Sequence, residues 1–259
     1  MVWLTQLNLP QFLLFLLVLT RTSGIVITVP VFGGSAIPMQ IRVLLAFTLA
    51  LLVVPSQLSA APPEAQSLAT VLIVMVGELV IGLVLGLGVQ IFFSGFQLAG
   101  QIISQMSGMS LAEVLSPDSD DSIPLLSNVL YLFALAIFVT VGGHRLLMSS
   151  LLDTFAAIPP GQARLAGTLV ESLQLLVTQS FSLGIRAAAP ATVALLLATV
   201  ILALVTRTMP QLNVLSFGFG LSALSLFGAL SLSLGAMAWL VEQQFDGVIE
   251  TVLKGLGVS

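Results

Sequence analysis

The sequence predicts an all-α integral membrane protein built from kinked helical hairpins. Hydrophobic residues make up 58% of the 259 residues and charged residues only 7%, whereas a soluble domain carries roughly 25% charged residues. The mean hydropathy is +1.15. Uncharged runs long enough to cross a hydrocarbon core of about 30 Å recur along the chain. Because backbone groups in lipid must be hydrogen-bonded within their own segment, these runs are expected to be helices.

The same composition excludes several classes of protein. Seven Lys and Arg and eleven Asp and Glu side chains are too few for a soluble enzyme of this size, and a net charge of −4 provides no basic footprint for nucleic acid. The absence of cysteine excludes disulfides and thiolate metal sites, and a single histidine excludes a metal site that needs two. The sequence therefore predicts no cofactor, no bound metal and no nucleic-acid partner.

The uncharged runs are the candidate membrane-spanning segments. Prolines 30, 38, 55, 190 and 210 lie inside or beside these runs and are expected to kink or end the helices. A single segment, 224–234, alternates with period two, which is too little to indicate a β-barrel. The runs are 1–20, 22–41, 43–63, 79–112, 122–144, 187–206 and 208–241.

Five charged residues lie within or between these runs: Arg21, Arg42, Glu78, Arg186 and Arg207. A charge at the centre of a bilayer costs about 2.5–3.5 kcal/mol on insertion scales. Glu78 is therefore expected to pair with Arg21 or Arg42 on a neighbouring helix, or to lie in a segment that lipid does not surround. Arg186 and Arg207 lie between runs and are expected at helix ends, where they can extend to the membrane interface.

Small residues at helical spacing predict close contacts between helices. Gly82 and Gly86 form a Gly-x-x-x-Gly step, and Ser225, Ala229 and Ser233 form a stripe with a spacing of four. Such stripes allow the backbones of two membrane helices to approach closely.

Three segments depart from the apolar pattern. Residues 106–124 contain four of the eleven acidic residues and several turn-forming residues, which predicts a loop. Residues 162–185 and 239–254 are predicted to be amphipathic helices. In the second of these, the polar face consists of Glu242, Asp246, Glu250 and Lys254, and the apolar face of Val241, Phe245, Val248, Ile249 and Val252.

Two motifs suggest chemistry, but their context argues against it. Ser110 and His144 would suit a serine protease, yet no oxyanion group accompanies them. Residues 218–223 match a dinucleotide-binding pattern, which functions only at a strand-to-helix turn. A secondary transporter that uses Glu78 as an ion site stays open as an alternative.

Several segments, in the same order along the chain, resemble the FliR family. Arg21 is followed by TVPVFG (28–33) and IPMQIR (37–42), then by GELVIGLVLG (77–86) and FQLAGQ (96–101). The pattern continues through Ala112, Pro117, Gly143-His144, Phe155 with IPPG (158–161), Ala189-Pro190, and RTMPQLNV (207–214). The most specific elements are Arg-x-x-Pro-Gln-Leu-Asn-Val and Glu-x-x-Ile-Gly-x-x-x-Gly.

The resemblance implies a non-enzymatic subunit of the flagellar type III protein export gate, located in the bacterial inner membrane at the flagellar basal body. In that family the subunit assembles with FliP-like and FliQ-like membrane subunits into a spiral around a closed pore. FlhB-like and FlhA-like export components, unfolded exported proteins and membrane lipid are the further partners implied. The injectisome counterpart, of SctT type, shares this layout and stays open as an alternative.

The resemblance also implies internal organisation. Residues 1–125 would form a FliP-like part, and residues 126–259 a part with a FliQ-like hairpin and an amphipathic tail. A pore-blocking plug would follow Gly100-Gln101, at residues 106–115, with a hydrated flank at 116–121. Judged on composition alone, this segment is a solvated loop. The implied plug residues are Met106, Gly108, Met109, Leu111, Val114 and Leu115.

Overall fold

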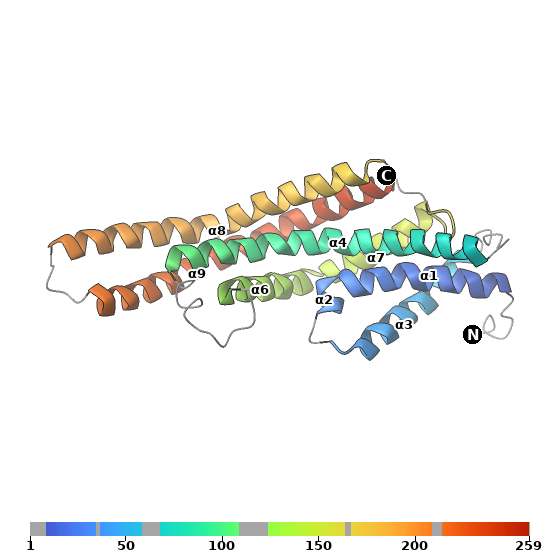
Figure 1. Cartoon of the computed structure of the whole chain (residues 1–259), viewed down its shortest axis with the longest axis horizontal. Helices are drawn as coiled ribbons and strands as arrows, with labels where there is room; N and C mark the ends of the chain where they lie inside the picture. Colours follow the sequence, from blue (N-terminus) through green and yellow to red (C-terminus); the bar gives the residue numbers. More distant parts are fainter. Residues whose placement is uncertain are drawn as a thin grey trace. The chain divides into compact units, whose positions relative to one another are not determined.

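The computed structural model contains helices and no strand in the residues that it describes, which confirms the all-α fold. These residues are 9–34, 37–58, 68–108, 124–163, 167–208 and 214–258, with side chains from residue 223 onward in the last range. The helices are α1 (Leu9–Thr28), α2 (Pro30–Gly33), α3 (Met39–Gln57), α4 (Leu68–Ser107), α6 (Leu125–Val141), α7 (Gly143–Ala157), α8 (Leu169–Thr208) and α9 (Val214–Leu256) (Figure 1).

Five of the described helices, α1, α3, α4, α8 and α9, are long and apolar enough to cross a membrane. Together, α6 and α7, which meet at Gly142, qualify as one further broken span. Gly142 has φ +87°, a left-handed conformation that glycine adopts at little cost, and it separates the two helices. The protein is therefore a multi-pass membrane protein.

The helix boundaries differ from those expected from the uncharged runs. Helices α4 and α8 each have 40 residues, so Glu78 and Arg186 lie inside helices and not between them. The run 22–41 is not one span, because α1 ends at Thr28 and α3 starts at Met39. The expectation that Arg186 lies at a helix end is therefore wrong, whereas Arg207 does lie in the last turn of α8. A charge that is paired or exposed does not interrupt the backbone hydrogen bonds.

Prolines act in two ways in these helices. Pro30 occupies the first turn of α2, where a missing N–H costs nothing. Pro55 and Pro190 lie inside α3 and α8, and each removes one backbone hydrogen bond without ending its helix.

The chain divides into two compact units. The first consists of Met1–Ile91, Gly142–Val177 and Phe245–Ser259. Within it α1 packs against α3, and the rings of Phe15 and Phe47 meet edge to face with centroids 5.4 Å apart. Val18 and Ile25 of α1 and Leu85 of α4 are among its fully buried side chains.

The second compact unit consists of Phe92–Val141 and Thr178–Gln244. Phe93 of α4 is buried in it, with ring centroids 5.4 Å from Phe138 and 6.0 Å from Tyr131 of α6. Where α8 crosses α4, a Cβ on Gly95 would lie 2.6 Å from the carbonyl oxygen of Ser180, so the two backbones meet without a side chain between them. The resemblance implies a division at residue 125 that is based on likeness to FliP and FliQ. The two compact units are defined by packing and do not test that division, so it stays a prediction.

The amphipathic tail has the faces that the sequence predicted. Its five apolar residues, from Val241 to Val252, are all at most 5% exposed. Glu242, Asp246, Glu250 and Lys254 are exposed, and Glu250 pairs with Lys254 at 2.7 Å.

Candidate functional site

The first compact unit contains a fully buried ion pair between Arg21 of α1 and Glu78 of α4. Arg21 Nε donates to Glu78 Oε2 at 2.6 Å, and both side chains are 0% exposed. Removal of two ions from water costs several kcal/mol each, so a buried pair is stable only when its other hydrogen-bonding positions are also filled. The other hydrogen-bond partners of Arg21 and Glu78 therefore determine whether the pair is stable and which segments it connects.

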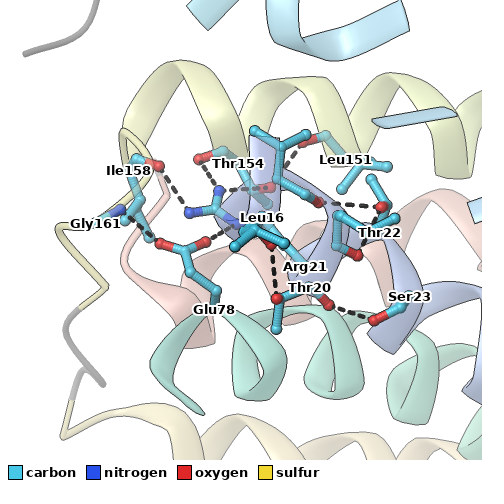
Figure 2. Close-up of polar contacts among 12 residues, drawn as sticks. Leu16, Thr20, Arg21, Thr22, Ser23, Glu78, Leu151, Thr154, Ile158 and Gly161 are labelled. Carbon is cyan, nitrogen blue, oxygen red and sulfur yellow. Dashed lines mark hydrogen bonds and ion pairs between the residues drawn. The ribbon is translucent and has the colours of Figure 1, made fainter. Parts of the chain in front are cut away.

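The remaining nitrogens of Arg21 bind the C-terminal end of α7. Nη1 donates to the Thr154 carbonyl at 3.0 Å and to Thr154 Oγ1 at 3.4 Å, and Nη2 donates to the Ile158 carbonyl at 3.0 Å (Figure 2). The carbonyls at the end of a helix carry partial negative charge, and the Thr154 carbonyl accepts the Ile158 N–H at 2.9 Å as well as the guanidinium. The guanidinium thus caps α7, and it also lies 4.2 Å from the ring centroid of Phe155.

The other oxygen of Glu78 binds the turn that follows α7. Oε1 accepts a hydrogen bond from the Gly161 N–H at 2.8 Å. Two prolines precede Gly161, and neither has an N–H to donate. Gly161 has φ +92°, which an L side chain rarely adopts. The pair therefore ties together four segments: α1, α4, α7 and the turn at 158–161 (Figure 2).

Glycines bring α1 close enough to α4 for this pair to form. A Cβ on Gly82 would collide with the Arg21 carbonyl oxygen, and one on Gly86 would collide with Thr28 Oγ1. On the other helix, a Cβ on Gly24 would lie 2.9 Å from the Leu79 carbonyl oxygen. Glu78 lies one turn before Gly82 on the same face, so this contact places its carboxylate beside Arg21. The Gly-x-x-x-Gly step thus makes the helix contact that the sequence predicted.

The small stripe on α9 also faces a neighbouring helix. Ser233 Oγ donates to the Ala187 carbonyl of α8, and both Ser233 and Ala229 are buried. This contact lies in the second compact unit.

The other three candidate charges have different surroundings. Arg42 does not pair with Glu78; its guanidinium donates to the carbonyls of Gly34 at 2.6 Å and Ile37 at 3.1 Å. It thereby joins both sides of the connection from α2 to α3. Arg186 and Arg207 are exposed on α8.

Of the six plug residues, only Met106 and Gly108 lie within the described residues. Met106 is in the last turn of α4, 43% exposed, and lines a small groove with Leu195, Thr199 and other residues of the second unit. Gly108 follows with φ +77°, a left-handed conformation that ends the helix. Met109, Leu111, Val114 and Leu115 lie outside the described residues, as does the flank 116–121.

Sequence reasoning missed the contribution of α7 and the following turn. Thr154 and Ile158 contribute carbonyl groups, whose role no side-chain pattern reveals. The Pro-Pro-Gly sequence was the available signal, because it marks a turn that offers one backbone donor. The arrangement positions helices; Glu78 is fully buried, and a hydrogen-bond donor already occupies each of its oxygens.

Comparison with known proteins extends over almost the whole chain. The profile of the family described as "Bacterial export proteins, family 1" matches residues 12–248, which include the ion pair and the turn that binds it. The flagellar biosynthetic protein FliR of Escherichia coli K12 is 30% identical over 231 residues, 88% of this chain and 86% of the relative. FliR of Bacillus subtilis 168 is 30% identical over 252 residues, 95% and 96% of the two chains. FliR of Caulobacter vibrioides is 31% identical over 229 residues, 86% and 90% of the two chains.

Proposed function

The chain belongs to the FliR family, family 1 of the bacterial export proteins, and from this premise we propose that it is a non-enzymatic subunit of the flagellar type III protein export gate. The observation that carries the proposal is the match over residues 12–248, together with flagellar relatives that align over 86% and 96% of their own length. In this role the chain helps to form a closed pore through which unfolded flagellar proteins leave the cytoplasm.

The proposed partners are FliP-like and FliQ-like membrane subunits in the bacterial inner membrane, with FlhB-like and FlhA-like components nearby. Large apolar side chains on several helices support a role inside an assembly, since they are exposed in the isolated chain. Leu52 of α3 and Ile73 of α4 are both 72% exposed. Such surface needs either lipid or protein against it.

A structural role also fits the chemistry of the strongest polar cluster. Arg21 and Glu78 use their hydrogen-bonding groups on each other and on the backbone of α7 and its turn. They leave no accessible general acid, base or ion ligand at that place. This supports the non-enzymatic role and argues against a transporter that binds its ion at Glu78.

Residues 106–115 are proposed to close the pore. Methionine side chains are flexible and fill irregular gaps, and an apolar constriction blocks a water-filled path by excluding water. Gly108, with φ +77°, ends α4 within this segment, a conformation that glycine adopts at little cost.

The gate function is tested by deleting the gene in its host and restoring it on a plasmid. We expect the deletion to abolish motility and the release of flagellar hook and filament proteins into the medium, and the plasmid to restore both. A host that stays motile but loses secretion of virulence effectors would assign the chain to an injectisome instead. Solute uptake by the purified chain alone in liposomes would favour the transporter.

The plug is tested by deleting residues 107–115 from the restored copy. We expect the assembled gate to leak small ions, measured as loss of membrane potential in growing cells. A deletion of residues 257–259, outside the proposed plug, serves as the control. A 107–115 variant that assembles and leaks no more than the intact protein would contradict the plug role.

A further inference from the structure

Helix α8 is too long for a bilayer. Its 40 residues extend about 60 Å at about 1.5 Å per residue, roughly twice the thickness of a hydrocarbon core. Only part of α8 can therefore lie in hydrocarbon, and the sequence of the helix should show which part.

Two exposed arginines on α8 are separated by about the thickness of a hydrocarbon core. Arg186 and Arg207 are both exposed, and neither forms a hydrogen bond or an ion pair with any side chain of the described residues. They are 21 residues apart, which corresponds to about 32 Å along a helix. This separation is close to the thickness of about 30 Å of a hydrocarbon core.

The surface between the two arginines is apolar and continuous. Successive residues of an α-helix are rotated by about 100° around its axis. On this basis the large exposed apolar side chains between the two arginines, and Arg207 itself, all lie within about 80° of the angular position of Arg186. The side chains on this lipid-facing stripe, as we name it, are Val193, Leu196, Leu197, Val200, Ile201 and Leu204, each 49–60% exposed.

The polar groups between the arginines are already satisfied. Residues 187–206 contain three polar side chains, all threonines. Thr192, Thr199 and Thr206 each donate the hydroxyl hydrogen to a carbonyl one turn earlier in α8, at 2.8–3.0 Å. A helix face in lipid must satisfy its polar groups in this internal way.

The backbone hydrogen bonding of α8 is interrupted at one end of the stripe. Pro190 has no N–H to donate to the Arg186 carbonyl, so that oxygen loses its partner in the helix. The adjacent carbonyl of Ala187 receives the Ser233 hydroxyl of α9. A carbonyl without a helix partner is costly in hydrocarbon but is readily hydrated at the headgroup level.

We propose that residues 187–206 of α8 cross the hydrocarbon core with the lipid-facing stripe against acyl chains, and that Arg186 and Arg207 bind lipid phosphates of the two leaflets. A partner helix would have to supply two anions about 32 Å apart on one face, whereas a bilayer presents phosphates at that separation everywhere. A water-filled channel would be lined by polar side chains, and this face has none. The inference does not depend on the proposed function.

The chain contains no cysteine, so single cysteines can be introduced without background. We would place one in turn at Val193, Leu197, Val200 and Leu204, attach a nitroxide, and measure collisions with oxygen and with a water-soluble nickel chelate. The sample is the full chain with the subunits that purify with it, in vesicles of phosphatidylethanolamine and phosphatidylglycerol. Phe181, 58% exposed, and Ala191, 0% exposed, are the control positions outside the stripe and inside the protein.

We expect high oxygen and low nickel accessibility at all four stripe positions, with the ratio greatest near Leu197, and low accessibility to both reagents at Ala191. Low values for both reagents along the stripe would show a protein partner there and overturn the proposal. High nickel accessibility along the stripe would show a channel and overturn it equally. Either result would leave the secretion test of the proposed function unaffected.

The arginines are tested in the same labelled proteins. Arg186→Gln and Arg207→Gln should each shift the maximum of the oxygen-to-nickel ratio along the stripe, and Arg186→Lys should leave it in place, because lysine also reaches the phosphates. Arg145→Gln, at an exposed arginine of α7, is the matched control and should cause no shift. An unchanged maximum in both glutamine variants would contradict the phosphate role.

Discussion

Arg21 and Arg186 are the same kind of residue in the same kind of helix, yet their surroundings are opposite. Each lies well inside a long apolar helix. Arg21 is 0% exposed and its guanidinium hydrogen-bonds to Glu78, Thr154 and Ile158. Arg186 is exposed and has no polar partner in the described part of the chain.

The difference shows that a charge in an apolar helix has two distinct uses. A buried charge must be neutralised and hydrogen-bonded by its own protein, so it fixes the positions of the segments around it. An exposed charge contributes little to the stability of the fold. It can instead interact with the molecules that surround the protein. The expected effects of substitution follow from this contrast.

The largest effect is expected for Glu78→Ala. This change leaves the Arg21 guanidinium buried without its counter-ion and the Gly161 N–H without an acceptor, at a cost of about 3–5 kcal/mol. We expect the protein to be lost from the purified complex and from the membrane fraction. Glu242→Ala, at an exposed carboxylate of α9, is the matched control and should accumulate normally. Normal assembly of Glu78→Ala would show that the pair does not hold the four segments.

A double variant separates the charge from the packing. Replacement of both partners by apolar residues, as in Arg21→Met with Glu78→Leu, removes the desolvation cost along with the attraction. We therefore expect the double variant to unfold at a higher temperature than either single variant. If its losses equal the sum of the two single losses, the side chains act independently and the pairing argument is wrong.

The sequence predicted that Glu78 needs a basic partner, and it left Arg21 and Arg42 open. The choice could not be made in advance, because the pair is 57 residues apart and depends on how closely α1 approaches α4. The Gly-x-x-x-Gly step predicted that approach correctly, since the signal lies in side-chain size alone. The two carbonyls from α7 were not predictable, because every residue has a carbonyl and only the tertiary fold selects these.

The helix lengths were the least predictable feature. The uncharged runs stop at Glu78 and at Arg186, and the sequence predicts Arg186 at a helix end, yet both residues lie within continuous helices of 40 residues. Glu78 has its counter-ion, Arg21, on another helix, and Arg186 is exposed. The amphipathic tail was predicted correctly, because the period of its polar residues depends only on local sequence.

A second, smaller effect is expected where glycine creates the room for the pair. Gly82→Ala would set a methyl group against the Arg21 carbonyl oxygen, so α1 must move away from α4 and lengthen the bond between Arg21 and Glu78. Such overpacking costs about 1–3 kcal/mol, measured as a lower midpoint of thermal unfolding of the purified complex.

The control for this change is another glycine inside a helix. A Cβ on Gly235 of α9 would meet no neighbouring side chain or backbone atom of the described residues within 4 Å. Gly235→Ala should therefore raise stability by about 0.5–1 kcal/mol, because alanine loses less conformational freedom than glycine in a helix. Destabilisation of the same size by both changes would mean that helix contact at Gly82 has no special role.

The next effect concerns the turn that binds Glu78. Gly161→Ala keeps the N–H that donates to Glu78 Oε1 but forces an L residue to φ +92°. A left-handed conformation costs about 1–2 kcal/mol for a residue with a Cβ. We expect a moderate fall in the unfolding midpoint. Gly161→Asn should fall less, since asparagine tolerates this conformation better, and an equal fall in both would point to a lack of space instead of strain.

The smallest effect on stability is expected at the exposed arginine. Arg186→Gln breaks no hydrogen bond or ion pair with another side chain of the described residues, so the unfolding midpoint of the purified complex in detergent should stay within about 2 °C of the intact protein. In vesicles the same variant should change the depth of the lipid-facing stripe, because the lipid phosphates are then present. An effect that appears only in a bilayer would establish that Arg186 serves the membrane and Arg21 the fold. A large loss of stability in detergent would instead reveal a protein contact at Arg186 and remove the contrast between the two arginines.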